Sequence, residues 1–120
     1  MANLFADGFE SGDLTAWSSA VTDSGDLSAH ADAKLHGSYG LKCVIDDTAA
    51  IYVQDNTPNG EKRYRFRVYI DPNGLTIGTT TQFLFLRAMH SDTTGTCGAW
   101  LKFVTATGYS IAVYAKEDDG

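Results

Sequence analysis

The sequence predicts an all-β domain, and three observations support that prediction. Twelve glycines, only two prolines and many Thr, Ser, Asp and Asn residues separate short apolar alternations, as in a chain with many turns. No long window keeps the period of about 3.6 residues that a helix requires. With 120 residues and 43% hydrophobic content, the chain is long enough for one domain, residues 1–120, that buries roughly two-thirds of its unfolded surface.

The chain opens with a predicted tight loop at residues 7–17, DGFESGDLTAW. Two glycines and three acidic residues surround Phe9, and Trp17 closes the segment. This composition predicts a turn that anchors Phe9 and Trp17 in a core.

Short strands are predicted to follow this loop. They span Leu27–Asp32, Tyr39–Asp46, Ala50–Asp55, Arg63–Ile70, Gln82–His90, Cys97–Thr105 and Tyr109–Glu117. In the second of them Leu41, Cys43 and Ile45 share a face, and in the third Ile51 and Val53 point inward. Cys43 and Cys97 are therefore both expected inside, where free buried thiols are favoured over a disulfide that would also be compatible with the pattern.

The strand at Arg63–Ile70 has the clearest alternation. Its inward set is Tyr64, Phe66, Val68 and Ile70, and its outward set is Arg63, Arg65, Arg67 and Tyr69. Asp71–Gly74, with Pro second and Asn-Gly after it, predicts that the strand ends there in a turn. The outer face would then present three guanidinium groups and a phenol about 7 Å apart.

The last three strands divide into two with clear faces and one without. The inward sets are Cys97, Ala99, Leu101 and Phe103 in one strand and Tyr109, Ile111, Val113 and Ala115 in the next, which leaves Trp100, Lys102, Tyr114 and Lys116 outside. Apolar residues occupy both faces of Phe83–Leu86, so this strand is expected to be central in its sheet and covered on its second face.

Three segments together resemble a known fold family. These are DGFESGDLTAW at residues 7–17, LHGSYGL at residues 35–41 and EKRYRF at residues 61–66. In this order they resemble concanavalin A-like and laminin G-like domains and jelly-roll carbohydrate-binding modules, over residues 4 to 117. The resemblance implies an antiparallel jelly-roll β-sandwich.

The resemblance also implies that strands are missing from the C-terminal part of the domain. Such domains run longer than 120 residues, so we expect the sandwich to be completed by another chain or by more of the same polypeptide. In the similar carbohydrate-binding modules, acids of the opening loop help to hold a structural calcium ion. This would assign Asp7 and Glu10 to calcium, together with an acid from the C-terminal region, whereas the alternative is an ordinary solvated acidic turn.

The charge distribution narrows the choice of partner. The formal net charge of −6 argues against nucleic acid. Residues 1–60 carry nine acids and two lysines, while residues 61–120 carry six acids and seven bases, so an anionic ligand would prefer the second half. No apolar run approaches the length of about 20 residues that a membrane span needs, and no signal sequence is visible. We expect no membrane insertion, and an extracellular or virion-associated location.

Nothing in the sequence predicts catalysis. Glycoside hydrolysis needs two carboxylates about 5 to 9.5 Å apart, and the Glu-x-Asp-x-x-Glu pattern of the jelly-roll glucanases is absent. The three histidines, at positions 30, 36 and 90, lack the spacing of a zinc site. We therefore expect a protein that is not an enzyme.

Two functions remain as hypotheses. Flat aromatic rings and planar donors suit sugar recognition, which favours a non-catalytic, lectin-like carbohydrate-binding module that uses Arg65, Arg67, Tyr69, Trp100 and Tyr114. Pairing of the arginines with acids on neighbouring strands is the plainer interpretation. The alternative function is a self-assembling virion or filament subunit, a homo-oligomer joined through strand edges at Phe83, Phe85, Tyr109, Ile111 and Val113.

Overall fold

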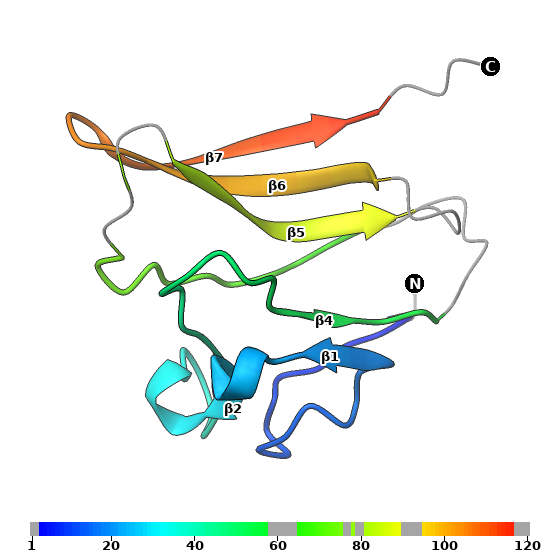
Figure 1. The fold of residues 1–120 in the computed structure, drawn as a ribbon. Coiled ribbons are helices and arrows are strands. Elements are labelled where there is room, and N and C mark those ends of the chain that lie inside the picture. The colour runs from blue at the N-terminus through cyan, green and yellow to red at the C-terminus, as the bar shows by residue number, and fades with distance from the viewer. Residues whose placement is uncertain (1–2, 58–64, 76–77, 79–80, 90–94, 117–120) are drawn as a thin grey trace. The chain divides into compact units, whose positions relative to one another are not determined.

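The computed structural model describes residues 3–57, 65–75, 78, 81–89 and 95–116. The strands are β1 (Ser19–Val21), β2 (Leu27–His30), β3 (Gly40–Cys43), β4 (Tyr52–Gln54), β5 (Gln82–Met89), β6 (Gly95–Val104) and β7 (Gly108–Ala115), with 3₁₀ turns η1 (Asp23–Gly25) and η2 (Ala31–Ala33) (Figure 1). Every strand pair is antiparallel. The predicted all-β class is thus confirmed. The chain divides into two compact units, residues 1–71 and 72–120.

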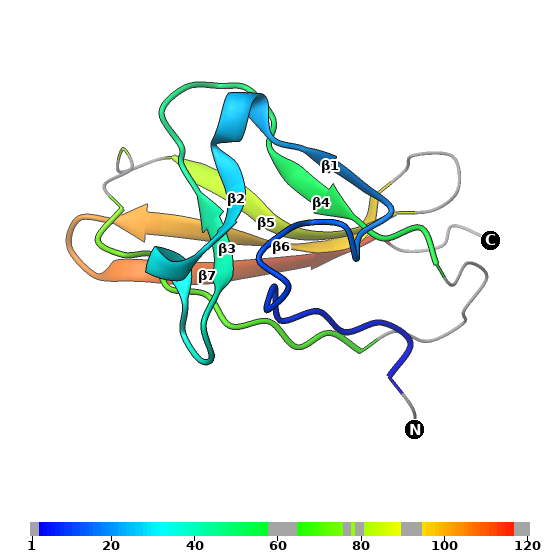
Figure 2. The same ribbon diagram turned by 90° about the horizontal axis from the view of Figure 1, so that it is seen from below.

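The first unit contains two small sheets. β1 pairs with β4 through Ala20 opposite Val53, and β2 pairs with β3 through Ala29 opposite Leu41 (Figure 2). The predicted second and third strands are present but shorter than expected. β1 was not predicted, because its three residues are all exposed and carry no alternation that the sequence could reveal.

The opening loop of this unit is built around Trp17. Its ring stacks on Phe9 at 5.9 Å between centroids and meets Phe5 edge-on at 4.7 Å. The indole N–H donates to Asp7 Oδ2 at 2.7 Å, and Asp7 Oδ1 accepts the Phe9 backbone N–H at 2.9 Å. Asp7 therefore satisfies the polar edge of a half-buried aromatic cluster, as the predicted anchoring of Phe9 and Trp17 requires.

The predicted strand at Arg63–Ile70 is not found in the described residues. Residues 65–71 belong to no sheet, and Arg63 and Tyr64 lie outside the described part. Phe66 and Val68 are 49% and 52% exposed, so their assignment to the core is wrong. Alternation favours extended backbone, but a strand also needs a hydrogen-bonded neighbour.

The turn after this segment forms one residue later than expected. The backbone N–H of Leu75 donates to the Pro72 carbonyl at 2.9 Å. Asn73 and Gly74 both have positive φ, at 48° and 69°. Pro72 is thus the first residue of the turn and Asn-Gly its centre, as a primed turn demands.

The second unit is a three-stranded sheet in the order β5-β6-β7. β5 is therefore an edge strand among the described elements, and the prediction that it is central is wrong. Its register shifts between Leu84, opposite Trp100, and Leu86, opposite Ala99, so Phe85 forms a β-bulge. The bulge sends Leu84 and Leu86 to opposite faces, which explains an apolar run on both faces of an edge strand.

Burial in this sheet is concentrated on β6. Ala99 and Leu101 are 6% and 2% exposed, which confirms that they face inward. Their β7 partners on the same face, Val113 and Ile111, are 79% and 56% exposed. The predicted alternation of β7 is correct, but the burial of its apolar side is wrong. Of the described residues, only Leu27, Ala99 and Leu101 are buried apolar side chains.

Both cysteines are free thiols. Cys97 is half-buried, whereas Cys43, the last residue of β3, is exposed, so its predicted burial is wrong. Desolvation of the Cys43 sulfur nevertheless raises the pKa of this thiol above its ordinary value. Among the described residues, no helix has the length and apolar character needed to cross a membrane.

Candidate ligand-binding face

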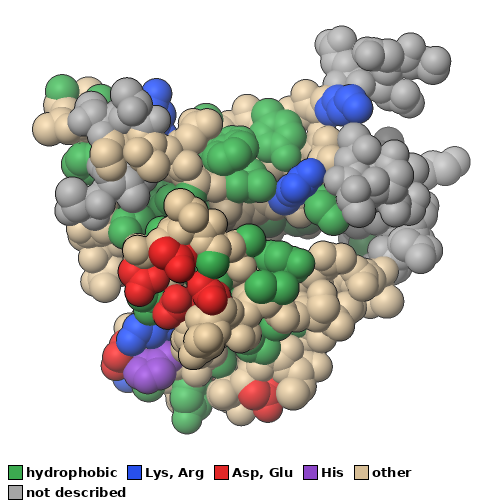
Figure 3. All heavy atoms as spheres, in the orientation of Figure 1, with side chains coloured by type: hydrophobic (Ala, Val, Ile, Leu, Met, Phe, Trp, Pro, Cys, Tyr) green, Lys and Arg blue, Asp and Glu red, His purple; other side chains and the backbone are tan. Residues whose placement is uncertain are grey.

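One face of the β5-β6-β7 sheet combines aromatic rings with cations. Cross-strand pairing gives three rows on this face, Arg87–Gly98–Tyr114, Leu84–Trp100–Ala112 and Gln82–Lys102–Ser110. We call the side chains Arg87, Trp100, Lys102 and Tyr114 the aromatic–cation face. Successive rows lie about 7 Å apart along the strands, so the two rings lie in neighbouring rows, with Arg87 in the row of Tyr114 and Lys102 one row beyond Trp100. Figure 3 shows hydrophobic side chains together with Lys or Arg over the three-stranded sheet.

Two glycines allow these side chains to lie close to the sheet. A methyl group on Gly98 would fall 2.6 Å from Tyr114 Cε1, so the tyrosine ring lies directly over this glycine. A methyl group on Gly95 would fall 2.8 Å from Arg87 Nε and 3.1 Å from the Tyr114 hydroxyl oxygen. The guanidinium and the phenol hydroxyl therefore converge on one point of the sheet, which only a residue without a side chain leaves open.

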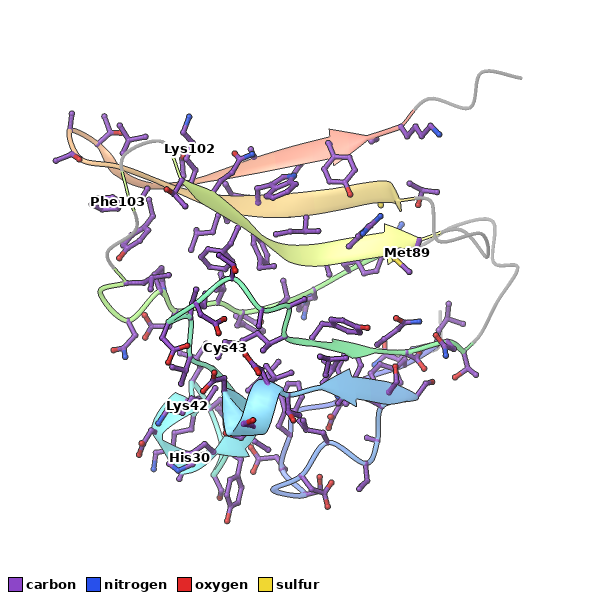
Figure 4. The ribbon with its side chains drawn as sticks, in the orientation of Figure 1. His30, Lys42, Cys43, Met89, Lys102 and Phe103 are labelled. Carbon is purple, nitrogen blue, oxygen red and sulfur yellow. The ribbon has the colours of Figure 1, made fainter. Side chains whose placement is uncertain are left out.

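The charged side chains described in this unit are all cations. Its described residues include Arg87, Lys102 and Lys116, and none of them is an Asp or Glu. Lys102 and Phe103 leave β6 on opposite sides, so Lys102 shares the face of Trp100 (Figure 4). Residues 72–120 also contain Asp92, Glu117, Asp118 and Asp119, which lie outside the described part, so the unit as a whole carries no net positive charge.

The structure brings together two of the five residues predicted to bind ligand. Trp100 and Tyr114 share the aromatic–cation face, each half-buried. Arg65, Arg67 and Tyr69 are exposed and belong to the other unit, with Tyr69 76% exposed.

Arg87 and Lys102 were absent from the predicted ligand-binding set. Lys102 was predictable, because it alternates with Trp100 on the outward side of the same strand. Arg87 was not, since the bulge at Phe85 reverses which side of β5 it faces.

The acids assigned to calcium by resemblance are engaged in hydrogen bonds within the opening loop. Asp7 accepts from Trp17 and Phe9, and Glu10 accepts the backbone N–H of Ser38 at 2.9 and 3.1 Å and that of Tyr39 at 3.4 Å. Within the described ranges, no three His, Cys, Asp or Glu side chains are grouped as metal ligands. Glu10 thus joins two of the segments that carry the family resemblance, residues 7–17 and 35–41.

A second charged cluster lies around η1. Partial burial and then the carboxylates of Asp46, Asp23 and Asp47 raise the pKa of Asp26 above its ordinary value. Figure 3 shows acidic side chains gathered on the face turned to the viewer.

The histidine nearest to charged partners is His30. Its Nδ1 accepts the Asp32 backbone N–H at 3.1 Å, and Asp32 also lies 3.4 Å from Lys42 Nζ (Figure 4). This arrangement caps η2 and is consistent with the expected surface role for this histidine, while His90 lies outside the described residues.

The residues predicted as an interface lie on the two edge strands of the second unit. Tyr109, Ile111 and Val113 on β7 are 39%, 56% and 79% exposed, and Phe83 and Phe85 on β5 are half-buried. Tyr109 also donates its hydroxyl to the Leu75 carbonyl at 2.6 Å and packs on Phe103 at 5.2 Å. Glu117, the last residue of the predicted edge, lies outside the described part.

Comparison of the chain with protein-family models, with curated proteins and with solved structures finds no match.

Proposed function

We propose that this chain is a non-catalytic carbohydrate-binding module of the jelly-roll type, and that its sugar-binding site is the aromatic–cation face. The observation that carries this proposal is that Trp100 and Tyr114 lie in adjacent rows of one face, with Arg87 in the row of Tyr114 and Lys102 one row beyond Trp100. A glycan partner also fits the expected extracellular or virion-associated location.

A sugar ring presents an apolar C–H side and polar hydroxyl groups. Its C–H side packs against flat aromatic rings, which lose little conformational entropy on binding because they have only two side-chain torsions. Its hydroxyl groups need hydrogen-bond donors, which Arg87, Lys102 and the Tyr114 hydroxyl supply. Because Trp100 and Tyr114 lie in adjacent rows of one face, each ring has room to stack on a different sugar, which favours an extended sugar chain over a single sugar.

The test is retention of the protein by immobilised or gel-embedded polysaccharides. Tyr114→Leu and Trp100→Leu remove the flat rings but keep apolar volume on the sheet, so we expect weaker retention and an unchanged fold. Tyr52→Leu is the matched control, because Tyr52 is 45% exposed on β4 of the other unit. Equal retention of all four proteins would contradict the proposed site, and no retention by any polysaccharide would contradict the proposed function.

The same experiment tests the residues of the first unit that the sequence predicted to bind ligand. Arg67→Gln and Tyr69→Leu change two exposed residues of the first unit. Weaker retention of these variants, with Tyr114→Leu unaffected, would move the site to that segment.

A specific observation also supports a second function, a self-assembling structural subunit. The β6–β7 register is unbroken over its eight pairs, β7 contains no proline or charged residue, and two of its apolar side chains are mostly exposed. Regular apolar edge strands pair readily with other strands. Light scattering over a range of concentrations separates the two functions, since a glycan-binding monomer keeps one mass and a subunit does not.

A further inference from the structure

We propose that β7 pairs antiparallel with β7 of a second copy of this chain, with Ile111 opposite the partner's Val113, and that the closed dimer joins two aromatic–cation faces into one surface. The pairing follows from the geometry of β7 alone, whereas its use in glycan binding rests on the proposed function. The second copy thereby supplies part of a binding surface that one chain cannot form by itself.

The hydrogen bonds between β6 and β7 decide which residues of β7 turn their backbone groups outward. The Lys116 N–H donates to the Thr96 carbonyl at 2.7 Å, and the register continues with Cys97 opposite Ala115. Because hydrogen-bonded and non-hydrogen-bonded pairs alternate in an antiparallel ladder, the even-numbered residues of β7 bond to β6. The N–H and C=O groups of the odd-numbered residues point away from β6. We call these the outer residues of β7: Tyr109, Ile111, Val113 and Ala115.

The edge that the outer residues form is open. β7 is the last strand of its sheet (Figure 1). Among the described residues, no hydrogen bond from another segment reaches the backbone of Ile111 or Val113, and their side chains are 56% and 79% exposed. A row of backbone donors and acceptors beside exposed apolar side chains is a template for a further strand.

The sequence of β7 is self-complementary in one antiparallel register. Every outer residue lies opposite an outer residue only when Ala112 faces the partner's Ala112, so that Ile111 faces Val113 and Tyr109 faces Ala115. A shift of two residues in either direction leaves an outer residue without a hydrogen-bonded partner. Gly108–Ala115 contains no charged residue, so no like charges of the two strands oppose each other.

A dimer through β7 would be closed, because the other edge of the sheet is irregular. The register of β5 shifts between Leu84 and Leu86 and again between Ala88 and Met89. Such bulges interrupt the regular spacing of outward donors and acceptors and twist an edge away from new strands. The regular edge, paired with itself about a two-fold axis, is no longer available for growth. We therefore expect assembly to stop at two chains.

The two-fold axis places both aromatic–cation faces on the same side of one six-stranded sheet. Opposite residues of an antiparallel pair point to the same face, so the row of Trp100 and Ala112 continues into the partner's Ala112 and the partner's Trp100. The two indole-bearing positions are three strand spacings apart, about 14 Å. The row of Tyr114 continues in the same way to the partner's Lys102. A sugar chain that crosses the strands would contact both copies.

Sedimentation over a range of concentrations, without sugar, tests the dimer. We expect the mass to rise from one chain to two and to stop there. A mass of one chain at every concentration would overturn the pairing, and a mass that keeps rising would overturn the closed dimer in favour of an open assembly. Val113→Pro replaces an outward N–H without removing a hydrogen bond to β6, so it should keep the mass of one chain and an unchanged circular dichroism spectrum.

Cysteine cross-linking tests the register, in a Cys43→Ser and Cys97→Ala background that lacks both native thiols. Ala112→Cys places one thiol of each copy beside the axis, where the Cα atoms of a non-hydrogen-bonded pair are about 4.5 Å apart and a disulfide can form. Ser110→Cys is the matched control, because it shares the strand and the face but would lie about 14 Å from its counterpart. We expect mild oxidation to link only Ala112→Cys. Equal linking of both variants, or of neither, would overturn the register.

Affinity electrophoresis in gels that contain xylan, β-mannan or polygalacturonate tests the shared surface. A polymer that reaches both copies gains affinity from bivalency. On a retaining polysaccharide we expect the unchanged protein to bind at least about tenfold more tightly than Val113→Pro, while calorimetry shows equal binding of the corresponding trisaccharide. Equal retention of the two proteins would overturn the shared surface and leave the pairing in place. Retention by none of the three polymers would contradict the proposed function, whereas the pairing, measured without sugar, would stand.

Discussion

Glu10 and Ser38, which lie far apart in the sequence, are joined by one carboxylate. Both Glu10 side-chain oxygens accept the Ser38 backbone N–H, at 2.9 and 3.1 Å. Gly37, immediately before Ser38, has φ of 77° and lies against the same carboxylate. The opening loop and the segment leading into β3 are thereby held together by a side chain that both must accommodate.

Gly37→Ala is expected to lower the free energy of unfolding by about 2 kcal/mol. A side chain at positive φ costs roughly 1–2 kcal/mol, and its methyl group would collide with the Glu10 carboxylate. Glu10→Ala removes that collision and loses the hydrogen bonds, at about 1 kcal/mol for a solvent-exposed acceptor. Denaturation of both single variants and the double variant tests the link. The double variant should lose less free energy of unfolding than the two single variants lose in sum. Strict additivity would contradict it.

Asp7→Ala should destabilise the first unit by about 2–3 kcal/mol. The carboxylate accepts the Trp17 indole N–H and the Phe9 backbone N–H, and its removal leaves half-buried donors without partners. The near-ultraviolet circular dichroism signal of the Phe5, Phe9 and Trp17 cluster should weaken in the same variant. Asp55→Ala is a control, since Asp55 makes comparable contacts with Ser18 and Thr57 that involve no aromatic cluster. An unchanged aromatic signal in Asp7→Ala would contradict this role.

Asp26 should make the protein less stable at neutral pH than at mildly acidic pH. Partial burial and three neighbouring carboxylates raise the pKa of Asp26 in the folded state, so the folded state binds a proton more readily than the unfolded chain. Stability from this group therefore falls as the pH rises above the ordinary carboxyl value of 3.8. Asp26→Asn should raise the melting temperature at pH 7, and this gain should disappear in acid.

Asp13 is the control, because its pKa is shifted in the opposite direction from that of Asp26. Hydrogen bonds from the Thr15 hydroxyl, the Thr15 backbone and Ser11 lower the pKa of Asp13 in the folded state. Asp13 therefore stabilises the fold at pH values above its ordinary pKa, and this stabilisation is lost as the pH falls through the lowered pKa. Asp13→Asn should thus lower the melting temperature at pH 7. If both variants shift it in the same direction, the local charge environments are assigned incorrectly.

The sequence predicts local patterns in this protein better than it predicts partners between strands. β5, β6 and β7 begin and end within two residues of their predicted limits in the described part, because alternation and flanking turns are local. The predicted strand at Arg63–Ile70 alternates just as clearly, yet residues 65–70 join no sheet. Whether a neighbouring strand is available depends on distant residues, and no local period contains that information.

The candidate site shows the same limit. Trp100 and Tyr114 were identified from alternation alone, since β6 and β7 pair without a register shift. Arg87 required knowledge of the bulge at Phe85, which changes the side that every later β5 residue faces. Arg65 and Arg67 were grouped with the aromatic residues only because a single sheet was assumed.

Truncation of Leu101 should cost much more stability than truncation of Ile111, although the two residues are paired neighbours on the same face of the sheet. Leu101 is 2% exposed and Ile111 is 56% exposed. Leu101→Ala should cost about 2–5 kcal/mol through the cavity that it leaves, whereas Ile111→Ala should cost under about 1 kcal/mol because little surface is removed from water on folding. Chemical denaturation of dilute protein measures both. Equal costs would indicate that Ile111 is buried in the protein in solution.

Val113 tests whether the apolar side of β7 meets another copy of the chain. At 79% exposure its replacement by Lys should change the unfolding free energy of dilute protein by less than about 0.5 kcal/mol. If copies pair through β7, a lysine in each partner places like charges within the new interface, and association should weaken at low salt. Sedimentation or light scattering at increasing concentration gives the measurement, with Tyr69→Lys, at 76% exposure in the other unit, as the matched control. A mass that remains that of one chain at all concentrations, in the unchanged protein as well as in Val113→Lys, would contradict assembly through this edge.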